Sequence, residues 1–171
     1  YSPSPQERQS WLQISYMKEA YHTMGPKFTL GWMAEALYSS KNFSENYTAT
    51  MMQAGEFAPT PHSKLMYNEA FRANQYVAAG IKPIYVLNDM FQFRTEFYGF
   101  TPIFPIKKNA LNKAYYGKAF SRFEYMGEVS VICHLPFGAI SAYVNHYSSP
   151  KREWNVGMTI GWQLFNYRFV E

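Results

Sequence analysis

Several features common in globular proteins are scarce in this chain. Charged residues make up 16% of the 171 residues, below the roughly 25% of an average soluble domain. No stretch approaches the roughly 18 consecutive apolar residues that a membrane-spanning helix needs. The single cysteine, Cys133, excludes an internal disulfide. The chain is therefore neither a helical membrane protein nor a disulfide-stapled secreted scaffold.

Motifs for catalysis, metals and cofactors are also lacking. The histidines have no metal-ligand spacing, and no Gly-x-Ser-x-Gly, Gly-x-Gly-x-x-Gly or P-loop sequence occurs. The net charge is +4, but the basic residues are scattered, so nucleic acid is not an expected partner. We assign no catalytic residue, no metal ligand and no cofactor. The four histidines are His22, His62, His134 and His146.

Large aromatic side chains are abundant instead. They make up 19% of the sequence, although the mean hydropathy is only −0.34. This combination is typical of transmembrane barrels, in which lipid-facing residues alternate with a polar interior and aromatic girdles lie at both interfaces. A soluble antiparallel sandwich or a lipocalin-like barrel also alternates, and it stays open as an alternative.

Residues 154–164 alternate between two faces without a fault. Such a strand is longer than the usual 5–6 residues or so of globular proteins, but it matches the roughly 9–11 residues of a tilted strand that crosses a bilayer. The pattern predicts a membrane-spanning strand, with polar residues on its other face. The predicted lipid-facing residues are Trp154, Val156, Met158, Ile160, Trp162 and Leu164.

Earlier segments repeat this pattern, with charged residues on the less apolar face. Keeping the apolar residues of 77–87 and 91–99 on one side of a sheet requires a three-residue connection, 88–90, because register parity fixes the faces. Charges on one strand face exclude a dry core but suit an ion-paired barrel interior, which could also gate or select ions. The predicted interior network is Lys82, Arg94, Glu96, Arg122, Glu124 and Glu128.

The whole chain divides into eight or nine such segments. The clearest are 28–38, 77–87, 91–99, 123–135, 140–145 and 154–164, whereas 9–22, 46–57 and 63–71 are strands with mixed faces. Short connections near 24–26, 58–62, 88–90 and 136–139 alternate with longer ones near 40–46, 70–75, 104–119 and 147–153. Such sorting is typical of bacterial outer-membrane barrels.

The run from Asn68 to Tyr76, with about five strands after it, resembles the BamA-like superfamily of bacterial surface antigen barrels. In that family an arginine on a long loop reaches into the barrel lumen. The resemblance implies this role for Arg72, although Ala73 and Asn74 stand in place of the family's Gly-aromatic pair. We expect Arg72 to bind an inward carboxylate, such as Glu96, Glu124 or Glu128.

The closing segments 135–147 and 154–169 resemble the C-terminal barrels of Bacteroidetes-type patatin-like phospholipases. The resemblance implies a patatin domain, a periplasmic domain and a sixteen-stranded barrel, of which this chain would be the C-terminal half. The patatin serine and aspartate have no counterpart here, so the segment is expected to be non-catalytic. Expected partners are outer-membrane lipid, the barrel assembly machinery at the C-terminal strand, and the N-terminal domains of the same chain.

We therefore predict an all-β, antiparallel transmembrane barrel segment of about eight strands over 1–171, with residues 1–7 as a linker. Open edges in lipid would leave backbone groups unpaired, so the edges require missing strands or a second copy. Two alternatives stay open. A self-contained eight-stranded outer-membrane barrel that binds or modifies lipid would pair its first and last strands, and a soluble lipocalin-like carrier would bury the 154–164 apolar face.

The chain's last residues break the alternation. From Phe165 the apolar residues move to the other face, through Tyr167 and Phe169. We expect a bulge or an interfacial aromatic girdle there.

Overall fold

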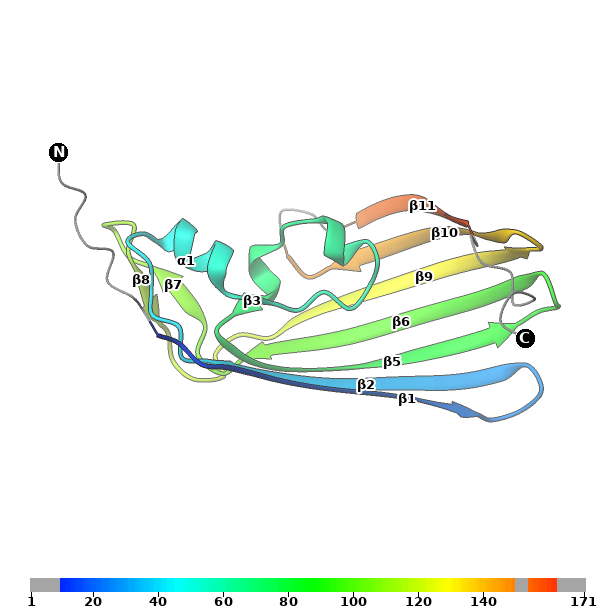
Figure 1. Cartoon of the computed structure of the whole chain (residues 1–171), viewed down its shortest axis with the longest axis horizontal. Coiled ribbons are helices and arrows are strands. Elements are labelled where there is room, and N and C mark those ends of the chain that lie inside the picture. Colours follow the sequence, from blue (N-terminus) through cyan, green and yellow to red (C-terminus); the bar gives the residue numbers. More distant parts are fainter. Residues whose placement is uncertain (1–9, 150–153, 163–171) are drawn as a thin grey trace.

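The computed structural model describes residues 10–149 and 154–162, and in them an antiparallel sheet dominates (Figure 1). Seven strands form this sheet in the order β1-β2-β5-β6-β9-β10-β11. The all-β, antiparallel prediction is confirmed at this level. The strands of the sheet are β1 (Gln13–Thr23), β2 (Phe28–Ser39), β5 (Gln75–Val86), β6 (Phe91–Pro102), β9 (Glu124–Leu135), β10 (Gly138–Tyr147) and β11 (Trp154–Trp162).

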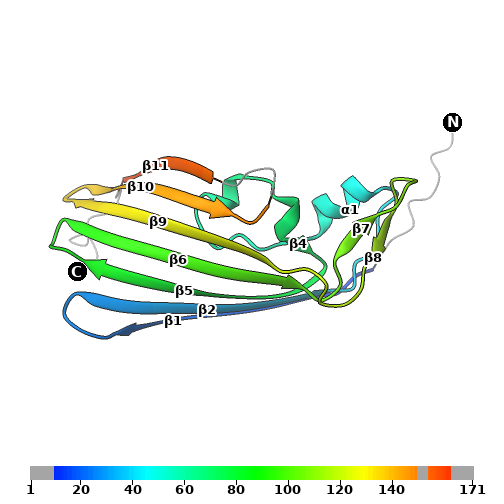
Figure 2. The same cartoon turned by 180° about the vertical axis from the view of Figure 1, so that it is seen from behind.

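Short and long connections lie at opposite ends of the sheet. The turns 24–27, 87–90 and 136–137 join neighbouring strands at one end, which Figure 2 shows at the left. The connections 40–74 and 103–123 leave from the other end, which we call the long-loop end. A short connection near 58–62 was wrongly expected, because these residues belong to the single long connection between β2 and β5.

The register follows the parity argument. Val86 pairs with Gln92, and the Leu87 amide donates to the Phe91 carbonyl at 3.0 Å, so the turn is the expected 88–90. Pro83 lies inside β5, where it has no N–H to give to the ladder. The β5–β6 pairing therefore lapses there and resumes in the same register.

The 40–74 connection corrects two expected strands, 46–57 and 63–71. Residues 46–57 contain helix α1 (Tyr47–Gln53), because Asn46 accepts a hydrogen bond from the Ala49 amide at 2.8 Å and caps the helix. Residues 63–71 form two single turns of 3₁₀ helix. The short elements of this connection are β3 (Gly55–Glu56), η1 (Ser63–Leu65), η2 (Glu69–Phe71) and β4 (Arg72–Ala73), and β3 pairs with β4.

The 103–123 connection, where a longer connection was expected near 104–119, carries a small hairpin. Its strands are β7 (Ile106–Lys108) and β8 (Ala114–Tyr116). Ile106 is buried in a cluster with Met51 and Ala54 of the 40–74 connection. Strands of three residues are too short to leave an alternating pattern in the sequence.

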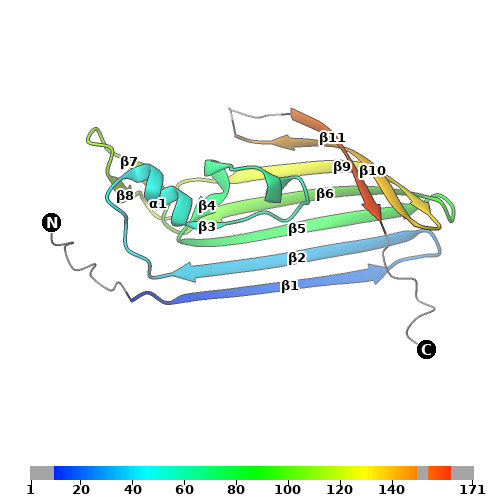
Figure 3. The ribbon, with the colours of Figure 1, turned by 45° about the horizontal axis from the view of Figure 1, so that its top comes forward.

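The 40–74 connection lies against one face of the sheet (Figure 3). Its Phe57 and Phe71 rings pack on Tyr76 and Phe100, with ring centroids 5.7–6.2 Å apart. We call this side the covered face and the opposite side the open face. Buried residues of the sheet's covered face are Met33, Leu37, Tyr76, Ala78, Tyr98, Phe100, Met126 and Tyr147.

The two edges of the sheet are β1 and β11, and within the described residues they do not pair with each other. The seven strands are fewer than the eight or nine expected, because 46–57 and 63–71 are not sheet strands. No helix in the described part of the chain has the length and apolar character needed to cross a membrane.

Some expectations fall outside the described residues. These are the linker 1–7, the face of Leu164 and the switch of faces from Phe165 to Phe169. The backbone of Trp162 belongs to β11, but its side chain is not described.

Candidate functional site

Charged side chains gather on the covered face of the sheet, beneath or beside the 40–74 connection. Lys82 and Glu128 are each 6% exposed, and Glu96 is fully buried. Because β-strand side chains alternate, their neighbours on the same strands point the other way. The predicted interior residues of these strands therefore do share one face.

Lys82 of β5 reaches across β2 to form a salt bridge with Glu19 of β1. Gly31 lies between them, and a Cβ there would be 2.6 Å from the Tyr21 ring and 3.1 Å from the Lys82 Cβ. The missing side chain thus makes room for both neighbours. Tyr21 also donates to Glu19 at 2.5 Å, which fixes the carboxylate from a second side.

Glu96 accepts hydrogen bonds from two residues of its own strand, Arg94 and Tyr98. These side chains share the covered face because they lie two residues before and after it. Glu128 of β9 lies directly opposite Glu96 in the register, and the Asn145 amide of β10 donates to it at 3.5 Å. These hydrogen bonds thus run within β6 and between β9 and β10, and those to a carboxylate are charge-assisted.

Arg72 sits at the start of β4 and pairs with Glu56 of β3 at 2.5 Å. Its guanidinium also donates to the Met52 carbonyl at 3.1 Å and lies 4.7 Å from the Tyr67 ring centroid. The arginine therefore ties the end of α1 to the β3–β4 pair.

The expected partners of Arg72 were Glu96, Glu124 and Glu128, and the structure gives it another. Glu124 binds Arg122 at 3.1 Å, and the other two carboxylates bind the groups described above. The physical reason is local: the β3–β4 register places Glu56 directly opposite Arg72. Sequence reasoning missed Glu56 because it assigned 46–57 to a strand with mixed faces.

The tip of the 40–74 connection reaches the sheet near the charged network. Thr60 and Ser63 are buried and bond each other at 3.1 Å, and His62 Nδ1 lies 3.0 Å from Tyr147 Oη. A small cavity of about 70 Å³ lies between this tip and the sheet. Its polar lining includes His62, Arg94, Glu128, Ser130, Tyr143 and Thr159.

The open face has the opposite character. Val156, Met158 and Ile160 are 80%, 65% and 62% exposed, and Trp154 is 68% exposed. Large apolar residues continue across the neighbouring strands without a charged side chain among them. Those of β5, β6, β9 and β10 that are exposed include Val77, Ile81, Tyr85, Phe91, Phe93, Phe97, Tyr125, Val129, Val131 and Val144.

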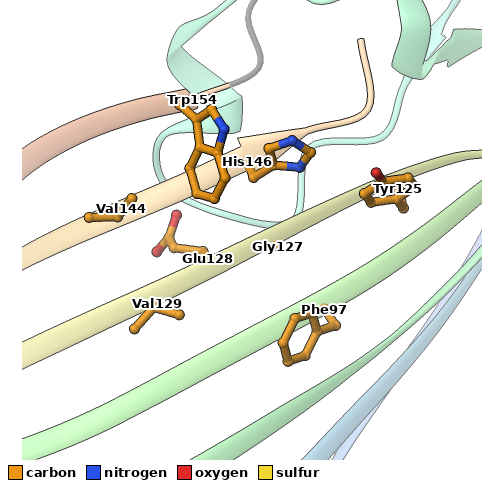
Figure 4. Close-up of a pocket in the computed structure, with 8 residues that line it drawn as sticks. All are labelled: Phe97, Tyr125, Gly127, Glu128, Val129, Val144, His146 and Trp154. Atoms are coloured by element: carbon orange, nitrogen blue, oxygen red, sulfur yellow. The ribbon is translucent and has the colours of Figure 1, made fainter.

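A hollow of about 320 Å³ opens in this face above Gly127 (Figure 4). His146 lies between Tyr125 and Trp154, with ring centroids 5.8 Å and 4.6 Å away. These three rings come from β9, β10 and β11 and form a row at the long-loop end. Phe97 and Val129 line the hollow toward the middle of the sheet.

Comparisons with known proteins do not assign this chain to a family. No family model, curated protein or solved structure matches this chain. The resemblance to BamA-like barrels and to patatin-like phospholipases therefore stays a prediction. In the described residues there is also no cluster of three or more His, Cys, Asp or Glu that would hold a metal ion.

Proposed function

We propose that this sheet is part of the wall of an outer-membrane β-barrel, with its open face toward lipid and its covered face toward the barrel interior. The observation that carries the proposal is that the charged side chains of β5, β6 and β9 all lie on the covered face, while the open face of these strands is apolar. Glu96 is fully buried, whereas Val156 on the outward side is 80% exposed. A soluble protein buries its apolar face and solvates its charges.

The size of the open face supports this reading. Soluble monomers rarely expose a continuous apolar patch larger than a few hundred Å², whereas here large apolar side chains are exposed on β5, β6, β9, β10 and β11. A soluble lipocalin-like carrier requires Trp154, Val156 and Ile160 to pack inward, and they are exposed instead. That alternative is therefore disfavoured.

The kinds of residue along the open face also fit a bilayer. Aromatic rings occur toward the long-loop end, as in Tyr125 and Trp154, and toward the other end, as in Phe91 and Phe93, with aliphatic residues such as Val129 between them. From residue 125 to 135, β9 extends about 34 Å. Tilted by about 40°, this projects to the roughly 25 Å apolar band of a transmembrane barrel.

The role that we propose for this wall is that of a membrane anchor or translocator, not of an enzyme. The 40–74 connection lies on part of the covered face, where Phe57 and Phe71 pack on the sheet, and Arg72 holds the connection together internally, so it acts as a partial plug of the interior. Attachment to a patatin-like lipid acyl hydrolase is a proposal that depends on the resemblance of the closing segments alone.

The unpaired edges, β1 and β11, need partners in such a membrane. Backbone groups left without a hydrogen bond in hydrocarbon each cost several kcal/mol. Strands from elsewhere in a longer chain, or from a second copy, would satisfy them. A self-contained barrel requires β1–β11 pairing, which is not found among the described residues.

Neighbouring small residues of β10 allow a direct test. A fluorophore is attached to Ala142→Cys on the open face, and in a second protein to Ser141→Cys on the covered face, both with Cys133→Ser. In vesicles with nitroxide groups in mid-chain, we expect strong quenching of the label at 142 and weak quenching at 141. Equal quenching, or stronger quenching at 141, contradicts the proposal.

A further inference from the structure

The 103–123 connection at the long-loop end combines exposed lysines with exposed aromatic rings, and we call it the basic arm. No Asp or Glu occurs between Pro102 and Glu124. Phe120, Leu111 and Tyr115 are 63%, 78% and 46% exposed. The arm's basic residues are Lys107, Lys108, Lys113, Lys118 and Arg122.

Among the residues that the structure describes, the lysines of the arm form no salt bridge with an acidic side chain. The four salt bridges found in the described part of the chain join other residues, and only Arg122 of the arm takes part in one. All four lysines are exposed. The arm therefore presents uncompensated positive charge, whereas the turns at the opposite end hold only Lys27 and Asp89.

A fixed framework holds these side chains in place. Ile106 is 3% exposed against α1, and Tyr116 accepts a hydrogen bond from the Asn74 amide at 3.1 Å. Phe120 has a left-handed backbone with φ of 51°, which a bulky residue adopts only at a cost. The strand pair turns Lys107 and Tyr115 to the same side of the hairpin.

The arm also continues directly into the open face. Its last residue, Phe123, is 65% exposed, and its ring lies where a Cβ on Gly99 would be 3.0 Å away. The row of Tyr125, His146 and Trp154 lies at the same end of the sheet. Lysines placed just beyond an aromatic girdle are at the height of lipid headgroups.

We propose that the basic arm binds the phosphate groups of anionic lipids at the membrane surface. We choose anionic lipid as the ligand because its charge is complementary to the lysines and because the arm is continuous with the open face. This inference therefore depends on the proposed membrane function. The lysines pair with headgroup phosphates, while Tyr115 and Phe120 enter the interface. Each lysine near an anionic surface strengthens binding about fivefold.

The test uses the full chain in vesicles, with a fluorophore on Leu111→Cys in the Cys133→Ser background. Quenching is compared between vesicles with a minority of brominated phosphatidylglycerol and vesicles with the same fraction of brominated phosphatidylcholine. We expect stronger quenching by the anionic lipid, and loss of this preference as NaCl rises from 50 mM to 500 mM, because salt screens exposed charges.

Two matched variants distinguish an effect of the arm's lysines from an effect of the protein's overall charge. Lys107→Gln/Lys113→Gln is expected to weaken the anionic preference by roughly 25-fold in relative association constant, whereas Lys27→Gln/Lys64→Gln removes the same charge elsewhere and should retain it. No preference in the parent protein, or equal loss in both variants, overturns the inference. Abolition of the preference by a short DNA duplex would assign the arm to nucleic acid and overturn it as well.

The two proposals fail in different ways. If the label at Ala142→Cys is quenched in pure phosphatidylcholine but the arm shows no anionic preference, only the basic-arm inference is wrong. If the label at 142 is not quenched, the membrane function itself is wrong.

Discussion

The two faces of β6 carry opposite kinds of side chain. Arg94 and Tyr98 both donate hydrogen bonds to Glu96 on the covered face, while Phe93 and Phe97 are exposed on the open face. One strand thus separates an ion-paired environment from an apolar one. The mean hydropathy of a strand does not show on which face its charged residues lie. What each face packs against accounts for their position.

We expect the largest loss of stability when the cation beside Glu96 is removed. Arg94→Met leaves a fully buried carboxylate without its ion pair, which costs about 3–5 kcal/mol. The measurement is the free energy of unfolding by urea in detergent micelles. Arg94→Met/Glu96→Gln removes both charges and should recover most of the loss, and a double variant as unstable as the single one would show that the pair is not the cause.

A charge placed on the open face tests its environment. Val129→Lys is expected to cost about 2–4 kcal/mol in a bilayer, because a lysine near the midplane must leave water. The matched change, Ala36→Lys, also lies on the open face but nearer the β1 edge. Folding yield into vesicles is the measurement, and a Val129→Lys protein that inserts as well as the parent would argue for water on this face.

Removing the N-cap of α1 should reduce the stability of the 40–74 connection by a smaller amount. Asn46→Ala removes the acceptor for the Ala49 amide and should cost about 1 kcal/mol. Asn46→Asp keeps an acceptor and should cost little. Hydrogen exchange of the α1 amides reports the loss, and unchanged exchange in Asn46→Ala would mean that packing of Met51 alone holds the helix.

The smallest effect is a pH dependence of the same connection. Burial, and then its hydrogen bond to Glu69, raise the pKa of Tyr47 well above 10. The neutral phenol is thus favoured in the folded state, so this contribution is present below pH 10 and is lost as pH rises above it. In a titration of tyrosine absorbance, Tyr47→Phe should lose a late-ionising group, and an unchanged late phase contradicts the assignment.

The long strands were predictable because their alternation has the period of a strand. Register parity in the sequence predicts the 88–90 turn and the face shared by Lys82, Arg94 and Glu96. The 40–74 connection was not predictable in this way. Its helix has seven residues, too few for a helical period to appear, and its packing depends on Phe57 and Phe71 meeting rings far away in sequence.

The partner of Arg72 shows the same limit. The sequence holds several carboxylates of suitable charge, and only the two-residue β3–β4 pairing selects Glu56 among them. The sequence predicted a longer connection near 104–119, but the hairpin of the basic arm and its anchoring through Ile106 depend on the fold. Local patterns predict faces well, whereas contacts between irregular segments depend on the whole chain.

The glycines of the covered face have a geometric consequence. A Cβ on Gly80 would lie 2.1 Å from the Tyr98 ring, and one on Gly31 would meet the Tyr21 ring. At both places an aromatic ring occupies the space of an absent side chain on the adjacent strand. The Tyr98 and Tyr21 rings can therefore lie over the backbone of the neighbouring strand, and any larger residue in place of Gly80 or Gly31 would have to displace them.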